Sequence, residues 1–442
     1  MYKLYIVIYE HSYTMFFMYK NTIILLSLIF FPSILFGEVT VSLEEIGERI
    51  PINSPVEGFD SSSNSYLDPF SDDPILFAIT SENYKQFEEH ILTPGQIAMF
   101  ETYPNSFKMN IYKSRRSCSV PQEVLDLTVD NATMTDEGEG IEGVVGSIPF
   151  PNPSEALHHV WNHILRYRGV DIEGGSPYYV VNPDSSRIMG AGKAVARNFW
   201  NPFLSNDKGL QGMIMSKVTE PPRLADAAVL VIESLNAFKT PRRAWVYNPG
   251  TRRVRRAPDI AYDNYNSFSQ GLTTTDSFDG FNGAKDRYEW TNVGEQLRFM
   301  PYNAYKFHEA KVEETLNPFH VNQDFLRYEL VRVNVVRADL KEDKRHILPH
   351  RVMYFDYDSH NMLAEDVFDG QLNIMRYREL PQINYYDEPM CNSIHSATYD
   401  LATRRYILNN VRSSDIPKVN WRVDTAHRDD LFTPNGLKRW AK

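Results

Sequence analysis

Apolar and polar residues alternate along much of the chain between about residue 170 and residue 412, the pattern of β-strands with one buried face. Residues 228–235 (AVLVIESL) form a nearly continuous apolar run typical of a buried strand, and residues 328–340 alternate throughout. Hairpins are predicted at residues 242–258, 350–370 and 397–411, where two such arms flank a short polar turn. Successive hairpins indicate an antiparallel meander. We therefore expect a mainly β (α+β) fold with a large curved antiparallel sheet or open half-barrel.

Helical spacing of apolar residues is clearest after Ser154, which is a suitable N-cap. Two shorter helices are predicted within residues 81–90 and 93–100, the first capped by Ser81 and the second with Pro94 in its first turn. Helices do not alternate with the later strands, which disfavours a doubly wound α/β fold. The apolar face of the helix after Ser154 consists of Leu157, Val160, Trp161, Ile164 and Leu165.

The N-terminus has the pattern of a secretory signal peptide. Lys20 precedes an apolar run from Thr22 to Phe36, which ends at Gly37. The run is shorter than the roughly 20 residues that a membrane-spanning helix needs, although an uncleaved anchor stays open as the alternative. We expect a signal peptide at residues 1–37, a flexible acidic segment at 38–72 and a single β domain at 73–442. The signal predicts export to the periplasm.

Composition narrows the class of partner. The chain of 442 residues carries a formal net charge of −11, and together with the export signal this argues against nucleic acid binding. The two cysteines, Cys118 and Cys391, lie away from the signal junction, so no lipid-anchor cysteine is predicted there. They could form a disulfide or remain as two buried thiols, and the sequence leaves both open. Their spacing is not that of a zinc site.

A cluster of arginines in the hairpin at residues 242–258 is the most unusual local feature of this acidic chain. Guanidinium groups bind phosphates and carboxylates through a planar fork, so the cluster could dock an anionic lipid headgroup or an acidic partner. Alternatively, the arginines pair with carboxylates on neighbouring strands. The residues are Arg242, Arg243, Arg252, Arg253, Arg255 and Arg256.

Two polar segments raise the question of metal binding. Asp276, Asp279 and Asn282 could coordinate calcium or line a cavity mouth, but their spacing is not that of an EF-hand, and a loop capped by its own aspartates is favoured. His159 and His163 stand one helical turn apart, yet they are opposite the apolar face and we expect them to face solvent. We predict no metal and no cofactor.

Motifs of catalysis do not occur in the sequence. There is no nucleophile elbow of the G-x-S-x-G type, no phosphate-binding P-loop and no dinucleotide fingerprint. Paired carboxylates cannot be recognised without geometry. We therefore expect a protein that is not an enzyme.

Several long motifs follow one another along the chain: LTPGQ (92–96), GIEGVVGSIPFPNP (140–153), WNHILRYRG (161–169), PPRLA (221–225), RRAWVYNPGTRRVRRAP (242–258), TTDSFDGFNGAKDRYEW (274–290) and PYNAY (301–305). Together they resemble a family of Gram-negative periplasmic proteins that is catalogued as a domain of unknown function and labelled outer-membrane lipoprotein-sorting-like. The resemblance runs from about residue 50 to Pro434, and it departs at residues 55–70 (PVEGFDSSSNSYLDPF), where the family has a Gly-rich opening. The family is similar to lipoprotein carriers of the LolA/LolB type, which implies a half-barrel with helices on its concave side and a cavity for acyl chains.

The leading hypothesis is a periplasmic carrier or binding protein for a lipid or another hydrophobic small molecule, with the arginines beside the cavity mouth. The alternative is a structural adaptor that docks an envelope transporter or an outer-membrane barrel without carrying a ligand; a hydrolase is the least favoured. Contact with a membrane surface is compatible with the first two. The cavity is predicted to be lined by Trp161, Leu165, Trp245, Tyr247, Phe278 and Phe281.

Overall fold

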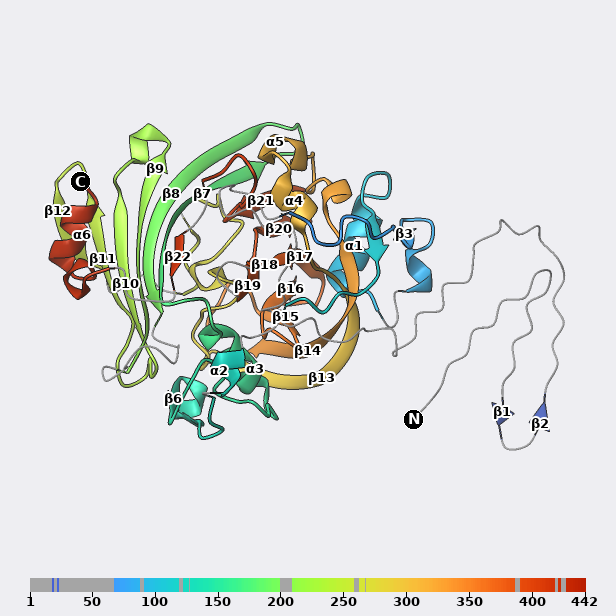
Figure 1. Ribbon diagram of the computed structural model, residues 1–442, viewed down its shortest axis with the longest axis horizontal. Helices are drawn as coiled ribbons and strands as arrows, with labels where there is room; N and C mark the ends of the chain where they lie inside the picture. The colour runs from blue at the N-terminus through green and yellow to red at the C-terminus, as the bar shows by residue number, and fades with distance from the viewer. Residues whose placement is uncertain are drawn as a thin grey trace. The chain divides into compact units, whose positions relative to one another are not determined.

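The computed structural model of the protein describes ten segments of the chain and two short strands near the N-terminus (Figure 1). The segments are residues 67–87, 91–118, 122–126, 128–198, 209–257, 262–266, 268–385, 390–417, 420–422 and 427–442. All ten belong to one compact unit, Glu48–Lys442. Among the described residues, no helix combines the length and the apolar character needed to cross a bilayer.

A second unit, Met1–Gly47, contains the predicted signal peptide. Its described part is a pair of antiparallel strands, β1 (Met18–Tyr19) and β2 (Thr22–Ile23). The rest of the predicted signal peptide, and the predicted flexible segment as far as residue 66, lie outside the described residues.

A 16-stranded sheet forms the framework of the larger unit. Its path of paired strands runs from β12 to β3 and does not close among the described strands, which confirms the predicted mainly β fold with an open sheet. We call β7 to β12 the first half of the sheet. Its strands are β7 (Asp171–Val181), β8 (Arg187–Asn198), β9 (Leu210–Glu220), β10 (Ala228–Ser234), β11 (Arg243–Asn248) and β12 (Arg253–Arg256).

The second half continues from β7 through its pairing with β21. In the predicted hairpins at residues 350–370 and 397–411, β15 pairs with β16 and β20 with β21, as the alternation indicated. Pairing is antiparallel except between β14 and β4. The second half consists of β21 (Arg405–Asn409), β20 (Ser396–Asp400), β17 (Ile374–Glu379), β16 (Met362–Phe368), β15 (His350–Asp356), β14 (Tyr328–Leu340), β13 (Tyr288–Pro301), β4 (Met109–Tyr112) and β3 (Phe77–Ile79). Strand β22 (Asn420–Arg422) also pairs with β7, while β5 (Thr133–Thr135) with β6 (Gly140–Glu142) and β18 (Gln382–Tyr385) with β19 (Met390–Ser393) form two small sheets.

The helices are few and short. Helix α1 (Pro94–Thr102) starts with Pro94 in its first turn as predicted, and the Thr93 side chain accepts a hydrogen bond from the Gln96 amide. The helix predicted at residues 81–90 is wrong in its described part, where the structure has a 3₁₀ turn over Tyr84–Gln86. Ser81 does not cap it, because its hydroxyl donates to the Pro104 carbonyl. The other helices are α2 (Gln122–Asp126), α3 (Ala156–Leu165), α4 (Tyr305–Glu309), α5 (Val312–Thr315) and α6 (Pro434–Trp440).

Two of these helices bury separate apolar clusters against the sheet. Helix α3, whose N-cap is Glu155 and not the predicted Ser154, packs Val160, Trp161 and Leu165 against β14, β15 and β16. Helix α6 packs Leu437 and Ala441 against the first half. The largest cluster lies between α1 and the second half.

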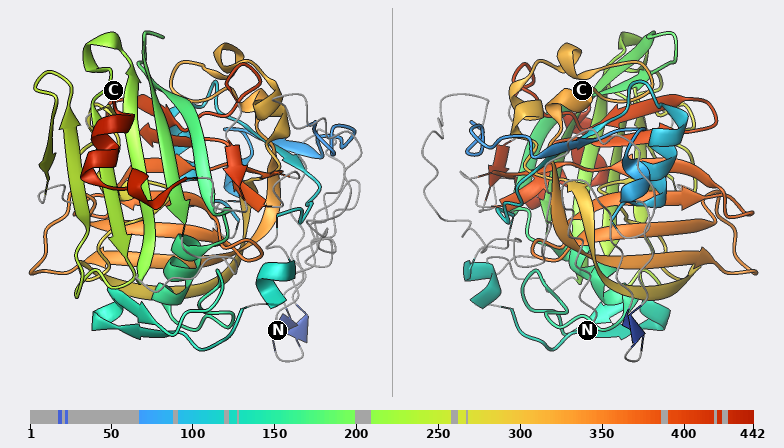
Figure 2. Two further views of the ribbon diagram at one scale, coloured as in Figure 1. Left: turned by 60° about the vertical axis from the view of Figure 1, so that its left-hand side comes forward. Right: turned by 90° about the vertical axis from the view of Figure 1, so that its right-hand side faces the viewer.

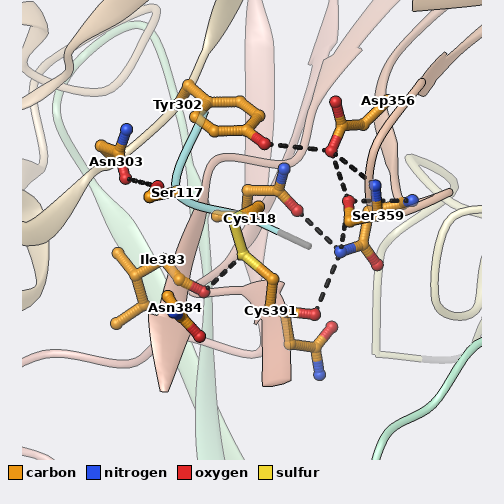
Figure 3. The surroundings of a disulfide bond; sticks show 12 residues. Ser117, Cys118, Tyr302, Asn303, Asp356, Ser359, Ile383, Asn384 and Cys391 are labelled. Carbon is orange, nitrogen blue, oxygen red and sulfur yellow. Dashed lines mark hydrogen bonds between the residues drawn. A yellow bond between two sulfur atoms is a disulfide. The ribbon is translucent and has the colours of Figure 1, made fainter. Parts of the chain in front are cut away.

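A disulfide joins Cys118 to Cys391, whose Cα atoms are 5.4 Å apart (Figure 3). Both residues are buried, and the Asn361 side chain donates hydrogen bonds to the Cys391 carbonyl and to Gln382 beside them. The bridge connects parts of the chain that are separated by 273 residues, so it fixes the segment after β4 to the small β18–β19 sheet.

Candidate functional site

The two faces of the first half differ in their side chains. Cross-strand register aligns Val195, Met215, Leu230 and Trp245 in one row across β8 to β11. Helix α6 covers this outer face, and Figure 2 shows the helix in front of these strands with the second half of the sheet behind them. The outer face is therefore a closed hydrophobic core.

The opposite face, which we call the inner face, has two rows of mostly small or apolar side chains. Because side chains alternate along each strand, the residues next to those of the outer row point to this inner face. Most of them are partly exposed, Val246 and Arg255 are exposed and Ala244 is buried, so the described structure leaves most of this surface incompletely covered. The first row is Gly174, Ala194, Ser216, Val229, Val246 and Arg255, and the second is Ile172, Ala196, Ile214, Val231 and Ala244.

An inner segment, residues 262–266 and 268–287, faces these rows. The Phe268 ring lies 5.0 Å from the ring of Tyr178 on β7, and the Gln211 side chain on β9 donates to Asn282 at 3.2 Å. The inner segment also presents exposed aromatic side chains, among them Tyr265 and Phe278, of which Phe278 is 47% exposed. Apolar surface therefore remains accessible on both the inner face and the segment opposite.

A pocket of about 380 Å³ lies where the second row ends at Ala244. The volume is within the range of small-molecule sites, about 300–1,000 Å³. Most of its walls are apolar, and charged side chains stand among them. The lining residues are Glu139, Ala237, Phe238, Pro241, Arg242, Ala244, Ala257, Tyr262, Ala284 and Asp286.

Arg242 is the cation of this pocket, and its charge is compensated. The guanidinium pairs with the Glu233 carboxylate, donates to the Asn282 carbonyl at 3.4 Å and lies 4.0 Å from the centre of the Tyr262 ring. Its Nε is buried and has no hydrogen-bond partner among the described residues. Burial raises the pKa of Tyr262 above its usual value, so its phenol stays neutral. The positive charge of Arg242 is therefore compensated within the wall of the pocket.

The acidic groups of the pocket are likewise engaged. The Glu139 carboxylate accepts from the backbone amides of Lys285 and Asp286, and Asp286 pairs with Lys344 at 3.1 Å. Lys285 is buried, with its ammonium group 4.1 Å from the centre of the Trp161 ring. Burial lowers the pKa of Lys285, partly offset by the nearby Glu139. The lining is thus close to electrically neutral.

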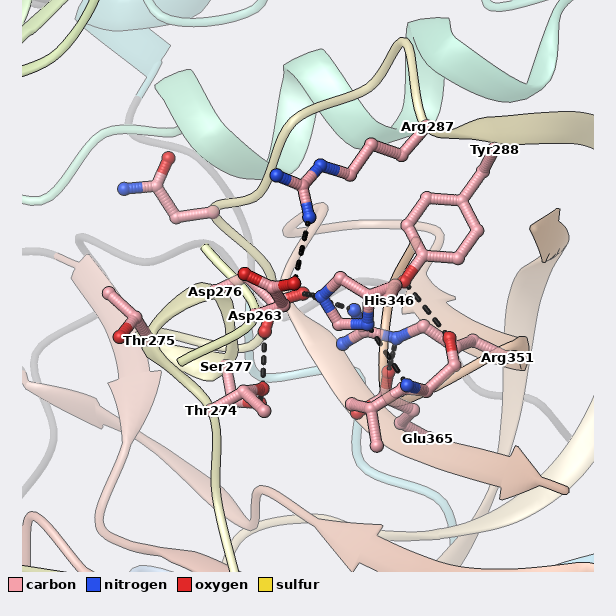
Figure 4. A network of polar contacts seen from close by, with 12 residues as sticks. Asp263, Thr274, Thr275, Asp276, Ser277, Arg287, Tyr288, His346, Arg351 and Glu365 are labelled. Carbon is pink, nitrogen blue, oxygen red and sulfur yellow. Dashed lines mark hydrogen bonds and ion pairs between the residues drawn. The ribbon is translucent and has the colours of Figure 1, made fainter. Parts of the chain in front are cut away.

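Buried ion pairs hold the inner segment to the second half of the sheet (Figure 4). Arg351, fully buried on β15, donates to Asp276 and to Glu365, each at 2.5 Å. Arg378 on β17 donates to Glu365 and to the Ser277 carbonyl, both at 3.0 Å. Burial alone would raise the pKa of Asp276, but Arg351 and His346 hold it well below its usual value. The inner segment is therefore fixed to the second half.

The candidate calcium ligands are occupied by protein groups. Asp276 binds Arg351, Asp279 binds Arg166 and Arg168, and the side chain of Asn282 accepts from Gln211. Within the described residues, no three His, Cys, Asp or Glu side chains form a group suited to a metal ion. We expected these aspartates to cap backbone amides of their own loop. In the structure their carboxylates bind arginines instead.

The expectation that His159 and His163 face solvent is wrong. Both are buried, and His163 is 1% exposed. The Nε2 of His163 bonds to the Asp279 carbonyl at 2.7 Å and its Nδ1 accepts from the Met362 amide at 3.1 Å. Burial lowers the pKa of His163 to about 3, so the ring is neutral. The inner segment covers this side of α3, which helical period alone could not reveal.

The residues predicted to line one cavity lie in different places. Trp161, Leu165 and Phe281 share the cluster beneath α3, where each is buried. Trp245 and Tyr247 belong to the outer face beneath α6, and Phe278 is on the inner segment. The structure therefore does not bring the six together. The inner-face alanines and valines were not singled out from the sequence, although alternation within residues 187–198 and 210–220 could have indicated them.

The arginines of the hairpin also divide into groups. Arg242 lines the pocket, while Arg243 and Arg256 are on the outer side of β11 and β12. Arg253 and Arg255 pair with Asn248 and Val246 in the register of the inner face. Arg252 lies in the turn between the strands.

Comparison with known proteins gives a family and several structural likenesses. The family described as "Protein of unknown function (DUF1329)" matches residues 78–438. A protein of Pseudomonas aeruginosa, itself called uncharacterized, is 36% identical over 384 residues, which is 84% of this chain and 83% of that protein. These matches confirm the resemblance found in the motifs.

Three solved structures are similar at low identity. A protein titled an outer membrane lipoprotein-sorting protein domain from Vibrio parahaemolyticus has 14% identity and a TM-score of 0.41, covering 61% of this chain and 92% of its own. A DUF1329 family protein from Desulfovibrio piger has 13% identity and a TM-score of 0.40 over the same shares. A LolA superfamily protein from Nitrosomonas europaea has 10% identity and a TM-score of 0.38, over 64% and 98%. These scores carry no argument about function.

Proposed function

This chain belongs to the DUF1329 family, and we propose that it is a non-catalytic carrier that binds a lipid or another hydrophobic molecule on its inner face. The proposed place of action is the periplasm, to which the signal at residues 1–37 would direct it. We assign the binding surface to the inner face of β8 to β11, and not to the helix α3 cluster, because that cluster is filled by its own side chains.

The contrast between the two faces of the first half is the observation that carries the proposal. On the outer face, Met215 and Leu230 are buried by α6, whereas their neighbours Ile214 and Val229 on the inner face remain partly exposed. A ligand that covered this surface would gain about 0.8 kcal/mol for each buried methylene. Small residues such as Ala194 and Ala196 leave room for a chain to lie across the strands.

The pocket beside Ala244 would hold the polar end of such a ligand. Since Arg242 is neutralised by Glu233, its unpartnered Nε–H suits an uncharged acceptor such as an ester or amide carbonyl. A ligand carbonyl there would satisfy a buried donor that otherwise costs about 1–3 kcal/mol to leave without a partner. An acyl ester or acyl amide therefore fits better than a free ion at this position.

The test is ligand uptake by a variant with a filled inner face. Ala194→Trp places an indole in the first row, where its neighbours Gly174 and Ser216 leave space for it. We expect at least a tenfold loss in binding of a fluorescent acyl ester, because the indole occupies the ligand surface. Native mass spectrometry of the purified protein would identify any bound lipid.

Lys193→Trp is the matched control. Lys193 is the adjacent residue on β8, is exposed, and points to the outer side of the strand. This variant should bind the acyl ester as the parent does. Equal binding by Ala194→Trp and the parent, or no binding by the parent, would overturn the proposal and favour an adaptor that carries no ligand.

A further inference from the structure

We propose that the edge of the first half, formed by the β11–β12 hairpin and the end of α6, docks on an anionic lipid bilayer. We call this region the basic edge and define it by Arg243, Arg252, Arg253, Arg255, Arg256, Lys438 and Lys442. The inference rests on the proposed function, since a carrier must exchange its ligand with a membrane, and it names the surface at which the exchange occurs.

The arginines of the basic edge are available for a partner. Four of them, Arg252, Arg253, Arg255 and Arg256, are exposed, and Arg243 is partly exposed. In the described part of the chain none of the five forms an ion pair, although carboxylates outnumber basic groups by 57 to 46 in the whole sequence. The alternative that these arginines pair with carboxylates on neighbouring strands therefore has no support among the described contacts.

Two described carboxylates near this edge already bind other cations, so among the described residues the positive charge of the edge is not compensated. Glu233 on β10 binds Arg242, and Asp430 binds Arg439 of α6. Helix α6 contacts β12 and adds the exposed Lys438, with Lys442 at the chain end. Charge complementarity thus favours an anionic partner at this edge.

The placement of the charges fits a lipid surface better than an acidic protein. Arg253 and Arg255 are on the inner side of β12, Arg256 is on the outer side, and Arg252 is at the turn. A protein partner would meet one face of the hairpin, whereas a hairpin that enters the headgroup layer meets phosphates on both faces. Exposed apolar groups accompany the charges, since Val246 is the cross-strand partner of Arg255 and Phe238, 72% exposed, lies at the pocket.

This geometry gives the ligand a short route. The first inner row ends at Val246 and Arg255, so a chain lying on Val229 and Ala194 would leave or enter at the basic edge. Three strand spacings separate β8 from β11, about 14 Å at the usual distance between strands. An acyl chain could therefore pass from the bilayer to the inner face without crossing the outer core.

The experiment is sedimentation of the purified protein with phosphatidylcholine vesicles that contain or lack phosphatidylglycerol. The parent should bind only the anionic vesicles, and the binding should weaken as salt is added. Arg253→Gln/Arg255→Gln should bind about 25-fold more weakly, at about fivefold for each basic residue near the membrane surface.

Arg345→Gln/Arg404→Gln is the matched control, because it removes two exposed arginines from the β14–β15 and β20–β21 connections and changes the net charge equally. It should bind the anionic vesicles as the parent does. If both variants lost vesicle binding equally, the loss would follow from the net charge alone, and the proposal would be overturned. Failure of the parent to bind anionic vesicles would also overturn it, and retention on immobilised polyglutamate in that case would assign the edge to an acidic protein.

Uptake of a dispersed short-chain acyl ester separates this inference from the proposed function. Arg253→Gln/Arg255→Gln should take up the dispersed ester normally while it fails to dock on vesicles. Ala194→Trp should show the opposite behaviour. If the two variants lose both properties together, docking and carrying are not separate, and the assignment of docking to the basic edge is wrong.

Discussion

Arginines of this protein fall into two groups that differ in almost every physical respect. Arg351 and Arg378 are buried, and both bind groups of the inner segment and the Glu365 carboxylate on β16. Arg253 and Arg255 are exposed at the sheet edge and have no ion pair among the described residues. The first group fixes one part of the chain to another, and the second remains able to bind something else.

The difference shows that the role of an arginine depends on its burial and its partners and cannot be inferred from the residue type alone. A buried guanidinium must be paired because desolvation of an unpaired charge costs several kcal/mol, so its partners lie within the same fold. An exposed guanidinium stays hydrated and gains little from a neighbouring carboxylate. Exposed and unpaired arginines concentrated at one edge therefore point outward to a partner.

Loss of a buried arginine should have the largest effect on stability. Arg351→Met leaves Asp276 and Glu365 without their shared cation in the protein interior. We expect the free energy of unfolding to fall by about 3–5 kcal/mol. Urea denaturation of the variant and the parent measures the difference.

Arg345→Met is the control for this change, since Arg345 is exposed in the connection between β14 and β15. It should alter the free energy of unfolding by less than about 0.5 kcal/mol. The contrast between the two groups of arginines would be unfounded if Arg351→Met and Arg345→Met had the same effect.

Some buried carboxylates bind no arginine, and their ionisation differs from that of Asp276, which is paired with Arg351. Glu379 accepts from the hydroxyls of Tyr328 and Tyr399, and burial raises its pKa to about 7 despite these tyrosines. A carboxyl whose pKa is higher in the folded state than in the unfolded state favours folding while it is protonated. Its contribution to stability is therefore present below about pH 4 and is lost as pH rises toward about 7.

Glu379→Gln should remove part of this pH dependence. We compare the free energies of unfolding of the variant and the parent at pH 5 and at pH 8. The difference in favour of the variant should increase from pH 5 to pH 8 by an amount on the order of a few kcal/mol. Urea denaturation at the two pH values gives the difference. Asp276 behaves oppositely, because its lowered pKa keeps its contribution until strongly acidic pH. If the stability of Glu379→Gln depended on pH in the same way as that of the parent, the raised pKa of Glu379 would be contradicted.

Removal of exposed arginines should have the smallest effect on stability. Arg253→Gln/Arg255→Gln should change the free energy of unfolding by less than about 0.5 kcal/mol, because no ion pair is lost among the described residues. The same denaturation experiment tests this, and it also ensures that a loss of vesicle binding is not caused by unfolding. A loss above about 2 kcal/mol would show that these arginines are structural after all.

Prediction from the sequence succeeded where the signal was local. The hairpins at residues 350–370 and 397–411 and the strand at residues 328–340 follow from alternation alone, because one face of each strand is buried. The prediction of a helix at residues 81–90 was wrong because side-chain hydrogen bonds fix a turn there. For example, the Asn83 side chain accepts a hydrogen bond from the Thr80 backbone amide. His163 was misplaced because the segment that covers it is 116 residues away in the chain.

Patterns within short stretches of the chain predict its mainly β character, its hairpins and the amphipathic helix α3, and its long motifs indicate the family. Contacts in the folded protein determine which face of β8 to β11 is closed by α6 and which stays partly exposed. They also determine which arginines are paired and that Cys118 bonds to Cys391. These facts depend on contacts between residues far apart in the chain, and alternation specifies two faces of a strand without specifying what covers each of them.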